Sequence, residues 1–372
     1  MLNPVLLHHV VDQAAERWPD APALTRGETT LSYAELAASS RSAALWLLHC
    51  GVRRGDRVVV IAPNHPATGV LAYACSRIGA VFVVLHDQVR GAGLAHVLGD
   101  AEPALVITDR AAARQAAEPV AATASLAEFW QAATAPSQDP QSAAELSHTP
   151  PPLAIDPVCL IYTSGSTGMP KAVVSTHAQL LFAAQAIHSC LRYRDNDIVY
   201  LALPFAFDYC LYQLFLAALA GAHAWMPEGG NAGPVLLRNL RRSQATVLPA
   251  VPSLADNLSR MIARYGGELR LRLLTNTGAA MPERTLTALR AQIPGLHVQL
   301  MFGLTECKRV SIMPPDEDLL RPGASGLPLP GTEVTVIGDD GTPLPPGAVG
   351  ELVVRGPHVM SGYWRRDRKS VV

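Results

Sequence analysis

Short runs that are apolar at nearly every position recur along this chain and alternate with helix-like segments. Three of them, rich in β-branched residues, occupy positions 57–63 (RVVVIAP), 80–85 (AVFVVL) and 104–109 (ALVITD). Runs without polar alternation are typical of strands covered on both faces, as in a parallel sheet. Five further runs follow the same pattern: VCLIYT, IVYLAL, ATVLPAV, LRLLTNTG and HVQLMFG. This alternation of strands and helices predicts an α/β fold with right-handed crossovers.

Other segments indicate how the chain is organised around that sheet. Helical periodicity is present at 4–17 and 33–50, and Ser32 with Glu35 three residues later forms the pattern of a capping box. From about 125 to 153 the chain is rich in Ala, Pro, Ser and Gln, which predicts a surface linker.

The pattern changes after about residue 320. The segment GTEVTVIGDDGTPLPPGAVGELVVRG has alternating strands joined by DDG and PPG turns, which predicts a small antiparallel sheet or barrel. We therefore expect a core of two packed α/β subdomains over 1–320, a small β-rich subdomain over 321–365 and a truncated polar tail over 366–372.

Charge and cysteine usage exclude several kinds of partner. Lys plus Arg is 30 and Asp plus Glu is 31, a formal net charge of -1, so no broad basic surface is available for nucleic acid or anionic lipid. The six cysteines are scattered without a CxxC pair, which argues against a cysteine metal site and favours free thiols in a reducing cytoplasm.

One apolar run raises the question of a membrane span. Residues 199–226 are long enough to cross a bilayer, but Pro204 interrupts them, Gly221 divides them, and Asp208 would lie within the hydrocarbon. A buried strand, a turn and a buried helix explain the run better. The N-terminus also lacks the pattern of a signal peptide.

The segment LIYTSGSTGMPKAVVSTH, residues 160–177, combines two glycines, six serine and threonine side chains and Lys171. Glycines let several backbone N–H groups converge on one anion, and a lysine can follow phosphate oxygens. The spacing is not that of a P-loop, because Pro170 precedes the lysine and Ala172 follows it. A flexible loop without a ligand is the simpler alternative, but the position directly after a buried strand favours phosphate binding.

The loop YTSGSTGMPK resembles the signature loop of the adenylate-forming superfamily, which includes acyl-CoA synthetases, luciferases and peptide-synthetase adenylation domains. Further motifs of that family are matched in the expected order by LSYAEL at 31–36, FGLTE at 302–306 and GELVVRGPHVMSGYW at 350–364. The resemblance implies the large N-terminal domain of this fold, with layered α/β sheets and a small C-terminal antiparallel β subdomain.

The resemblance also implies a reaction. A carboxylate attacks the α-phosphate of ATP, which gives an acyl-adenylate and pyrophosphate. By resemblance, Lys171 contacts the β- and γ-phosphates, Thr305 touches the α-phosphate, and Glu306 holds Mg²⁺, a cation that prefers carboxylate oxygen. The remaining phosphate-loop positions are Thr163, Ser164, Gly165, Ser166, Thr167 and Gly168. The adenine slot is assigned to Gly278, Ala279, Ala280, Phe302 and Gly303.

The choice of acid depends on the motif PFAFDYCLYQLF, residues 204–215, in which Asp208 falls where amino-acid-activating relatives pair the substrate ammonium. A helix-capping role for Asp208 is the alternative. The remaining implied pocket residues are Phe207, Tyr209, Tyr212, Pro249, Thr275, Thr277 and Met301. Lys308 or Arg309 could meet a second substrate carboxylate, although we expect solvated charges there. We expect a structural role for His177.

The family's small C-terminal lid, with its lysine and the ribose-binding aspartate before the hinge, has no counterpart before Val372. We therefore expect weakened nucleotide binding and impaired turnover of this chain alone. Three hypotheses remain. The first is activation of an amino acid for a carrier-protein thiol supplied in trans, the second is an acyl- or aryl-CoA ligase, and the third is a non-catalytic nucleotide-binding module.

Overall fold

The computed structural model of the chain describes residues 4–135, 146, 149–163 and 169–366. Its first sheet has six strands, and the three apolar runs predicted to be buried parallel strands form its centre. The strands, in spatial order, are β6 (Ala122–Ala124), β5 (Leu105–Thr108), β3 (Arg57–Ile61), β4 (Val81–Leu85), β7 (Pro157–Thr163) and β8 (Lys171–Thr176). All neighbours are parallel except β7 and β8, which pair antiparallel on either side of the predicted phosphate loop.

The second sheet has nine strands, and its six central ones are parallel. In spatial order they are β15 (Leu327–Pro328), β14 (Ser311–Ile312), β13 (His297–Phe302), β12 (Leu273–Asn276), β11 (Val247–Ala250), β9 (Ile198–Tyr200), β10 (His223–Met226), β1 (Pro22–Arg26) and β2 (Thr29–Ser32). Antiparallel strands close both edges, β2 on one side and β14 with β15 on the other. The predicted α/β fold with parallel sheets is confirmed.

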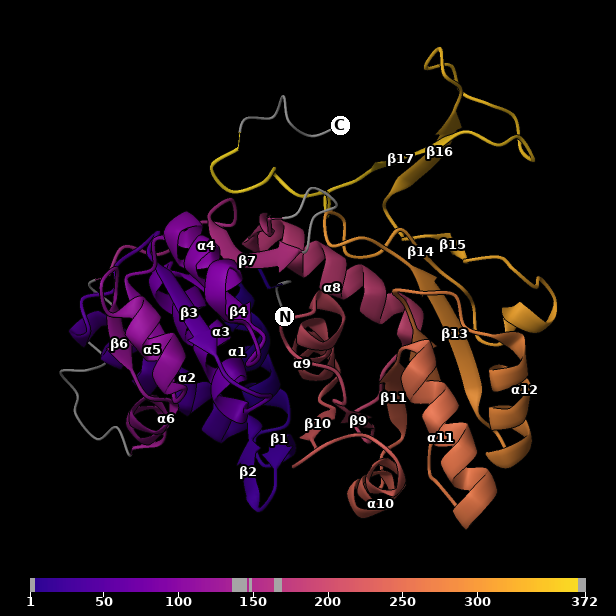
Figure 1. The fold of residues 1–372 in the computed structure, drawn as a ribbon, viewed down its shortest axis with the longest axis horizontal. Coiled ribbons are helices and arrows are strands. Elements are labelled where there is room, and N and C mark those ends of the chain that lie inside the picture. The colour runs from indigo at the N-terminus through magenta and orange to yellow at the C-terminus, as the bar shows by residue number, and fades with distance from the viewer. Residues whose placement is uncertain (1–3, 136–145, 147–148, 164–168, 367–372) are drawn as a thin grey trace.

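The helices form three layers around the two sheets. One apolar core holds side chains from both sheets together with α1 (Leu7–Arg17), α2 (Tyr33–His49), α3 (Pro66–Ile78), α8 (His177–Leu191) and α9 (Asp208–Ala220). Figure 1 shows α8 and α9 lying between the sheets. The outer face of the first sheet carries α4 (Gly91–Ala101) and α5 (Ala111–Ala117). The outer face of the second carries α10 (Pro234–Ser243), α11 (Pro252–Tyr265) and α12 (Glu283–Gln292).

The apolar run at 199–226 folds as the sequence predicted, into β9, the buried helix α9 and β10. Gly221 ends α9 in the left-handed conformation, with φ of 74°. Among the described residues, no helix combines the length and hydrophobicity needed to cross a membrane.

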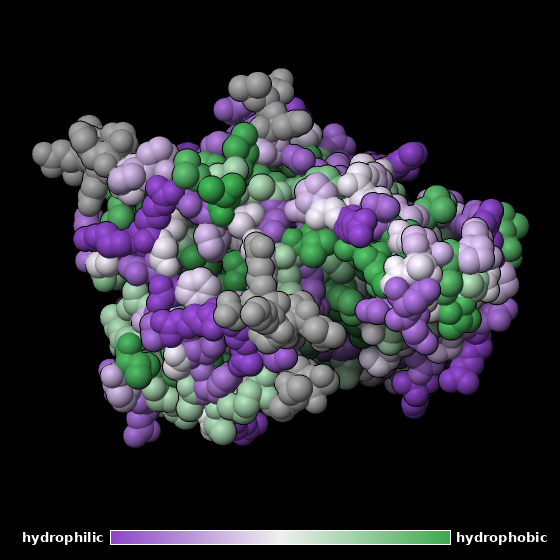
Figure 2. Space-filling model, turned by 90° about the horizontal axis from the view of Figure 1, so that it is seen from above, coloured by the Kyte–Doolittle hydropathy of each residue, from purple (hydrophilic) through white to green (hydrophobic). Residues whose placement is uncertain are grey.

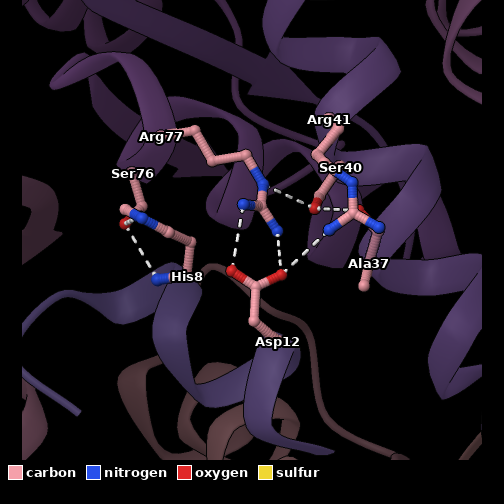
Figure 3. Close-up of polar contacts among 7 residues, drawn as sticks. All are labelled: His8, Asp12, Ala37, Ser40, Arg41, Ser76 and Arg77. Carbon is pink, nitrogen blue, oxygen red and sulfur yellow. Dashed lines mark hydrogen bonds and ion pairs between the residues drawn. The ribbon is translucent and has the colours of Figure 1, made fainter. Parts of the chain in front are cut away.

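Polar side chains join the N-terminal helices to one another. The predicted capping box of α2 is present, because the Ser32 hydroxyl accepts from the Glu35 N–H while the Glu35 carboxylate accepts from the Ser32 N–H. Figure 3 shows Asp12 of α1 between two guanidinium groups. It accepts from Arg77 of α3 at 2.6 and 3.1 Å and from Arg41 of α2 at 3.1 Å. This ion cluster fixes three helices at one point.

The segment expected to be a surface linker near 125–153 begins instead with a packed helix, α6 (Leu126–Thr134). Ser125 and Glu128 form a second capping box, and the Phe129 ring lies edge-on to Trp46 of α2, with 5.5 Å between the ring centroids. The linker prediction is wrong over these residues because the Ala-rich composition obscured a local helix start.

The C-terminal region contains a 3₁₀ turn, η1 (Glu317–Leu319), and the predicted small antiparallel sheet of β16 (Glu333–Ile337) and β17 (Glu351–Arg355). After β17 the chain returns to the first sheet, where Tyr363 forms an antiparallel bridge with Val173 of β8. In Figure 1 this final segment, drawn in yellow, crosses above β7 and α8.

Candidate active site

The predicted substrate pocket lies where β11, β12 and β13 of the second sheet meet the first turn of α9. Pro249 and Thr275 are direct partners on neighbouring strands, and both are buried. The hydroxyls of Tyr209, on α9, and Thr275 are hydrogen-bonded at 2.7 Å. Met301, near the end of β13, is also buried. Residues far apart in sequence thus form one wall, as expected at the carboxyl ends of parallel strands.

Asp208 lies beside a buried cation. It is the first residue of α9, the preceding Phe207 is the N-cap, and no side-chain hydrogen bond caps this helix, so the capping alternative does not describe it. Asp208 Oδ2 lies 3.6 Å from Arg309 Nη1. The Arg309 side chain is 4% exposed and that of Asp208 is 15% exposed, so water screens the pair weakly.

The expectation that Lys308 and Arg309 are solvated charges is wrong. Both are buried, and the Arg309 guanidinium lies over the Tyr209 ring, 4.9 Å from its centroid. Lys308 donates from Nζ to the Thr305 carbonyl at 2.7 Å, and burial lowers the pKa of its ammonium although Asp208 opposes this shift. The chain can turn inward here because Gly303 has no side chain, which lets the backbone at Lys308 and Arg309 pack closely against it. A Cβ at Gly303 would lie 2.2 Å from the Lys308 carbonyl oxygen.

Three pocket side chains carry buried polar atoms without a hydrogen-bond partner: Tyr212 Oη, Thr277 Oγ1 and Arg309 Nε. Buried polar atoms are paired in the great majority of cases, so each exception calls for an explanation. Arg309 pairs with Asp208, Tyr212 and Thr277 are predicted pocket residues, and a bound polar molecule would explain all three unpaired atoms. The same burial raises the pKa of the Tyr212 phenol well above its ordinary value, which keeps that group a neutral donor.

The residues assigned to the triphosphate come from both sheets. Thr163 ends β7, its hydroxyl donates to the carbonyl of Lys171 at 3.4 Å, and Lys171 begins β8. Ser164, Gly165, Ser166, Thr167 and Gly168 lie outside the described residues. Glu306 follows β13, and its Oε1 accepts from the Tyr363 hydroxyl at 2.7 Å.

The predicted adenine residues form a more open surface. Gly278, Ala279 and Ala280 follow β12 and are exposed, with Gly278 at a φ of 89°. Phe302 is 38% exposed at the end of β13. Figure 2 shows the molecule from above, where hydrophobic residues gather around a hollow near the centre.

Phe207 is the pocket residue that points away from the core. It is 58% exposed, and its ring lies edge-on to His86, with 6.5 Å between the ring centroids. Beside it a cavity of about 510 Å³ opens between the two sheets, lined by His86, Phe205, Asn64 and Asn231 among others.

A divalent cation would fit at Glu306 only in part. Its carboxylate supplies the hard oxygen that Mg²⁺ prefers, but the described residues contain no group of three or more His, Cys, Asp and Glu side chains able to hold a metal ion. Mg²⁺ is commonly bound by one or two carboxylates together with substrate phosphates. The residues present therefore suit an ion shared with a nucleotide.

Tyr363 was not assigned to the site from the sequence, although it lies within the motif GELVVRGPHVMSGYW. Its ring faces Lys171, whose Nζ lies 5.3 Å from the ring centroid, and its hydroxyl binds Glu306. The only sequence signal was its place in that motif. His177, expected to be structural, is fully buried, and its Nδ1 accepts from the Leu7 N–H at 3.1 Å.

Two layered α/β sheets, with the predicted site residues near their strand ends, form the arrangement expected of an adenylating, acid-activating enzyme. The chain belongs to the AMP-binding enzyme family, whose model matches residues 11–364. It is 32% identical over 354 residues to a feruloyl-CoA synthase from an Amycolatopsis species, covering 94% of this chain and 69% of the relative. It is 31% identical over 367 residues to an L-proline–[L-prolyl-carrier protein] ligase from Streptomyces coelicolor, covering 93% and 69%.

Solved structures agree with this assignment. The crystal structure of VinN has a TM-score of 0.90 and 37% sequence identity, covering 98% of this chain and 92% of that one. A complex of VinN with L-aspartate has a TM-score of 0.89 and 38% identity over the same shares. The fold is therefore that of the N-terminal domain of adenylate-forming enzymes.

Proposed function

We propose that this chain uses ATP to adenylate a small amino acid that carries a second carboxylate, an aspartate-like substrate. The observation that carries the proposal is the ion pair of the partly buried Asp208 and the buried Arg309, with 3.6 Å between Oδ2 and Nη1. The pair offers one anion and one cation side by side, and it matches the ammonium and carboxylate attached to a single carbon of an amino acid.

Such a substrate would have one carboxylate to spare. If Asp208 binds the ammonium and Arg309 the neighbouring carboxylate, the side-chain carboxylate is the one left for ATP. Arg309 retains donor capacity for this role, because its Nε is buried without a partner. The large buried rings of Tyr209 and Tyr212 limit the space, which favours a small acid.

The comparisons support this reading. VinN, the structural neighbour at 38% identity, was solved with L-aspartate and also with 3-methylaspartate. The Streptomyces coelicolor relative joins proline to a carrier protein. We therefore propose a carrier-protein thiol, supplied in trans, as the acceptor of the activated acid.

Lys171, Thr305 and Glu306 are the proposed catalytic residues. The substrate carboxylate attacks the α-phosphate and pyrophosphate leaves, so positive charge must meet both growing anions. Lys171 would neutralise the departing phosphates, with the hydroxyl of Thr163 near the same end. Thr305 would bind the α-phosphate. Its carbonyl accepts from Lys308 Nζ at 2.7 Å, so the ammonium lies close to Thr305. Mg²⁺, when bound at Glu306, supplies charge neutralisation of the phosphate oxygens.

An aryl-CoA ligase is the second candidate, favoured by the feruloyl-CoA synthase relative at 32% identity. In that case the Asp208–Arg309 pair would be a structural ion pair, CoA would be the acceptor, and an aromatic acid would have to fit the pocket. A simple aromatic acid carries no ammonium, so it would leave the charged pair without a counterpart.

Calorimetry with non-hydrolysable sulfamoyl-adenosine analogues tests these proposals through binding alone. The analogues would carry aspartate linked through its side-chain carboxylate, aspartate linked through its α-carboxylate, and ferulate. We expect the side-chain-linked aspartyl analogue to bind most tightly, and Asp208→Asn to weaken it about 30-fold or more, since a buried charged contact is worth roughly 2–4 kcal/mol. Asp256→Asn, on the exposed face of α11, is the matched control.

Other results would redirect the assignment. Preference for the feruloyl analogue with a silent Asp208→Asn variant supports the aryl-CoA ligase. Preference for the α-linked aspartyl analogue overturns the assignment of the reacting carboxylate. Failure of every analogue to bind the folded chain would refute adenylation itself.

A further inference from the structure

The segment after β17 is held against both parts of the proposed nucleotide site. On one side it extends the first sheet, because the Val174 N–H donates to the Gly362 carbonyl at 3.2 Å and the Trp364 N–H donates to the Ala172 carbonyl at 2.9 Å. On the other side the Met360 N–H donates to the Glu306 carbonyl at 2.8 Å. The backbone of 360–364 therefore links β8 to the loop that follows β13.

Trp364 anchors the end of this segment. Its indole N–H donates to the Asp100 carbonyl at 3.2 Å, and the Arg57 guanidinium lies over its ring, 5.5 Å from the centroid. Tyr363 lies between two such contacts: Trp364 after it is bound to Asp100 of α4, and Met360 before it is bound to the Glu306 carbonyl. The backbone at Tyr363 is therefore held from both sides.

The Tyr363 side chain contacts two residues of the proposed machinery at once. Its hydroxyl donates to Glu306 Oε1 at 2.7 Å, and Lys171 Nζ lies 5.3 Å from the centroid of its ring. Glu306 follows a strand of the nine-stranded sheet, whereas Lys171 begins a strand of the six-stranded sheet. A single phenol thus spans the junction between the sheets, with its polar end on an anion and its π face on a cation.

We propose that Tyr363 is a positioning residue that sets Glu306 and Lys171 relative to one another and so couples divalent-cation binding to triphosphate binding. The inference rests on the proposed function, because it assigns Glu306 to the cation and Lys171 to the phosphates. The Tyr363 hydroxyl donates a hydrogen bond to one oxygen of the Glu306 carboxylate and so restricts rotation of that carboxylate. The ring holds the lysine ammonium in place while its donors stay free, since a cation–π contact uses no hydrogen-bond acceptor.

The two contacts can be separated by substitution. Tyr363→Phe removes the bond to Glu306 and keeps the ring beneath Lys171, whereas Tyr363→Leu removes both. Tyr200→Phe is the control, because the Tyr200 hydroxyl also donates at 2.7 Å, to Asn231 Oδ1, and neither residue is assigned to the nucleotide site. Binding of α,β-methylene-ATP, a non-hydrolysable analogue, would be measured by calorimetry over a range of MgCl₂ concentrations.

For Tyr363→Phe we expect the MgCl₂ concentration at half-maximal stimulation of binding to rise about tenfold, with binding in the absence of Mg²⁺ unchanged. For Tyr363→Leu we expect the same rise and, in addition, Mg²⁺-free binding weakened about threefold. Tyr200→Phe should match the wild type in both. In a Glu306→Gln background, Tyr363→Phe should cause little further change in the Mg²⁺ dependence.

Several outcomes would overturn the inference. One is an unchanged Mg²⁺ dependence in Tyr363→Phe, and another is an equal rise in Tyr200→Phe. A third is an additive effect in the Glu306→Gln background, which would mean that the hydroxyl does not act through Glu306. If the wild type itself fails to bind α,β-methylene-ATP, the proposed function fails, and that result is distinct from all three.

Discussion

Replacing Arg309 by methionine is the sharpest test of the charged pair at the pocket. Methionine keeps much of the side-chain volume and flexibility of arginine, so the principal change is loss of the guanidinium. The substitution leaves the carboxylate of Asp208, which is 15% exposed, without its partner, and it removes the cation from the Tyr209 ring. We therefore expect the variant to be less stable than the wild type.

The size of the effect follows from the geometry. Two unit charges 3.6 Å apart interact by about 4.6 kcal/mol at an effective dielectric constant of about 20. Breaking one partner of a buried pair costs about 3–5 kcal/mol, and partial exposure of Asp208 places the expectation for Arg309→Met at the lower end, about 3 kcal/mol. Asp208→Asn together with Arg309→Met should lose less than the sum of the single losses, by about 1–3 kcal/mol.

Urea unfolding of the wild type, both single variants and the double variant supplies the four free energies of this cycle. The slopes of the unfolding curves must agree, because a changed slope would mean that the unfolded or native state has altered. A coupling below about 0.5 kcal/mol would refute the reasoning, since that is the size found for independent sites. The pair would then contribute nothing beyond two separate side chains.

Three further predictions concern the rest of the chain. Gly303→Ala should destabilise the fold by about 1–3 kcal/mol, since its Cβ would lie 2.2 Å from the Lys308 carbonyl oxygen, whereas Gly99→Ala in α4, with open space around the Cβ, should stabilise it slightly in the same urea assay. Burial lowers the pKa of His177 to about 4, below its unfolded value of about 6.5, so its neutral form favours folding above pH 6.5 and this stability is lost as the pH falls towards 4. His177→Asn, which keeps an acceptor for the Leu7 N–H, should flatten that loss, up to about 3 kcal/mol, in unfolding measured against pH. Asp12→Ala should lower the free energy of unfolding by about 2–4 kcal/mol, because it leaves the Arg77 side chain, 10% exposed, without its carboxylate. Thermal unfolding measures this, and equal melting temperatures of variant and wild type would contradict it.

The fold was largely predictable because its signals are local. The strands at 57–61, 81–85 and 105–108 are apolar at nearly every position, and only burial on both faces suits such a pattern. The capping box at Ser32 likewise needs only four consecutive residues. The helix over 126–134 carried the same kind of signal in Ser125 and Glu128, and the composition of its surroundings hid it.

The candidate site was predictable only in part. Motif spacing indicated Asp208, Lys171 and Glu306, each beside a turn or strand end. It could not show that Arg309 is buried against Asp208, because more than 100 positions separate them in the sequence. In the sequence, the charged run ECKRV is typical of solvated surface. In the structure Lys308 and Arg309 are buried, because Gly303 allows the backbone to pack closely at this turn.

The sequence by itself determined the kind of fold, the loops at the strand ends and the family, since each depends on residues close together in the chain. Only the tertiary structure decided which charges face one another. Two parallel sheets place their strand ends at a common junction, and there α9 brings Asp208 to Arg309 while the returning segment brings Tyr363 to Glu306 and Lys171. The strength of a contact between charges depends on their distance and burial, and a local sequence pattern determines neither quantity.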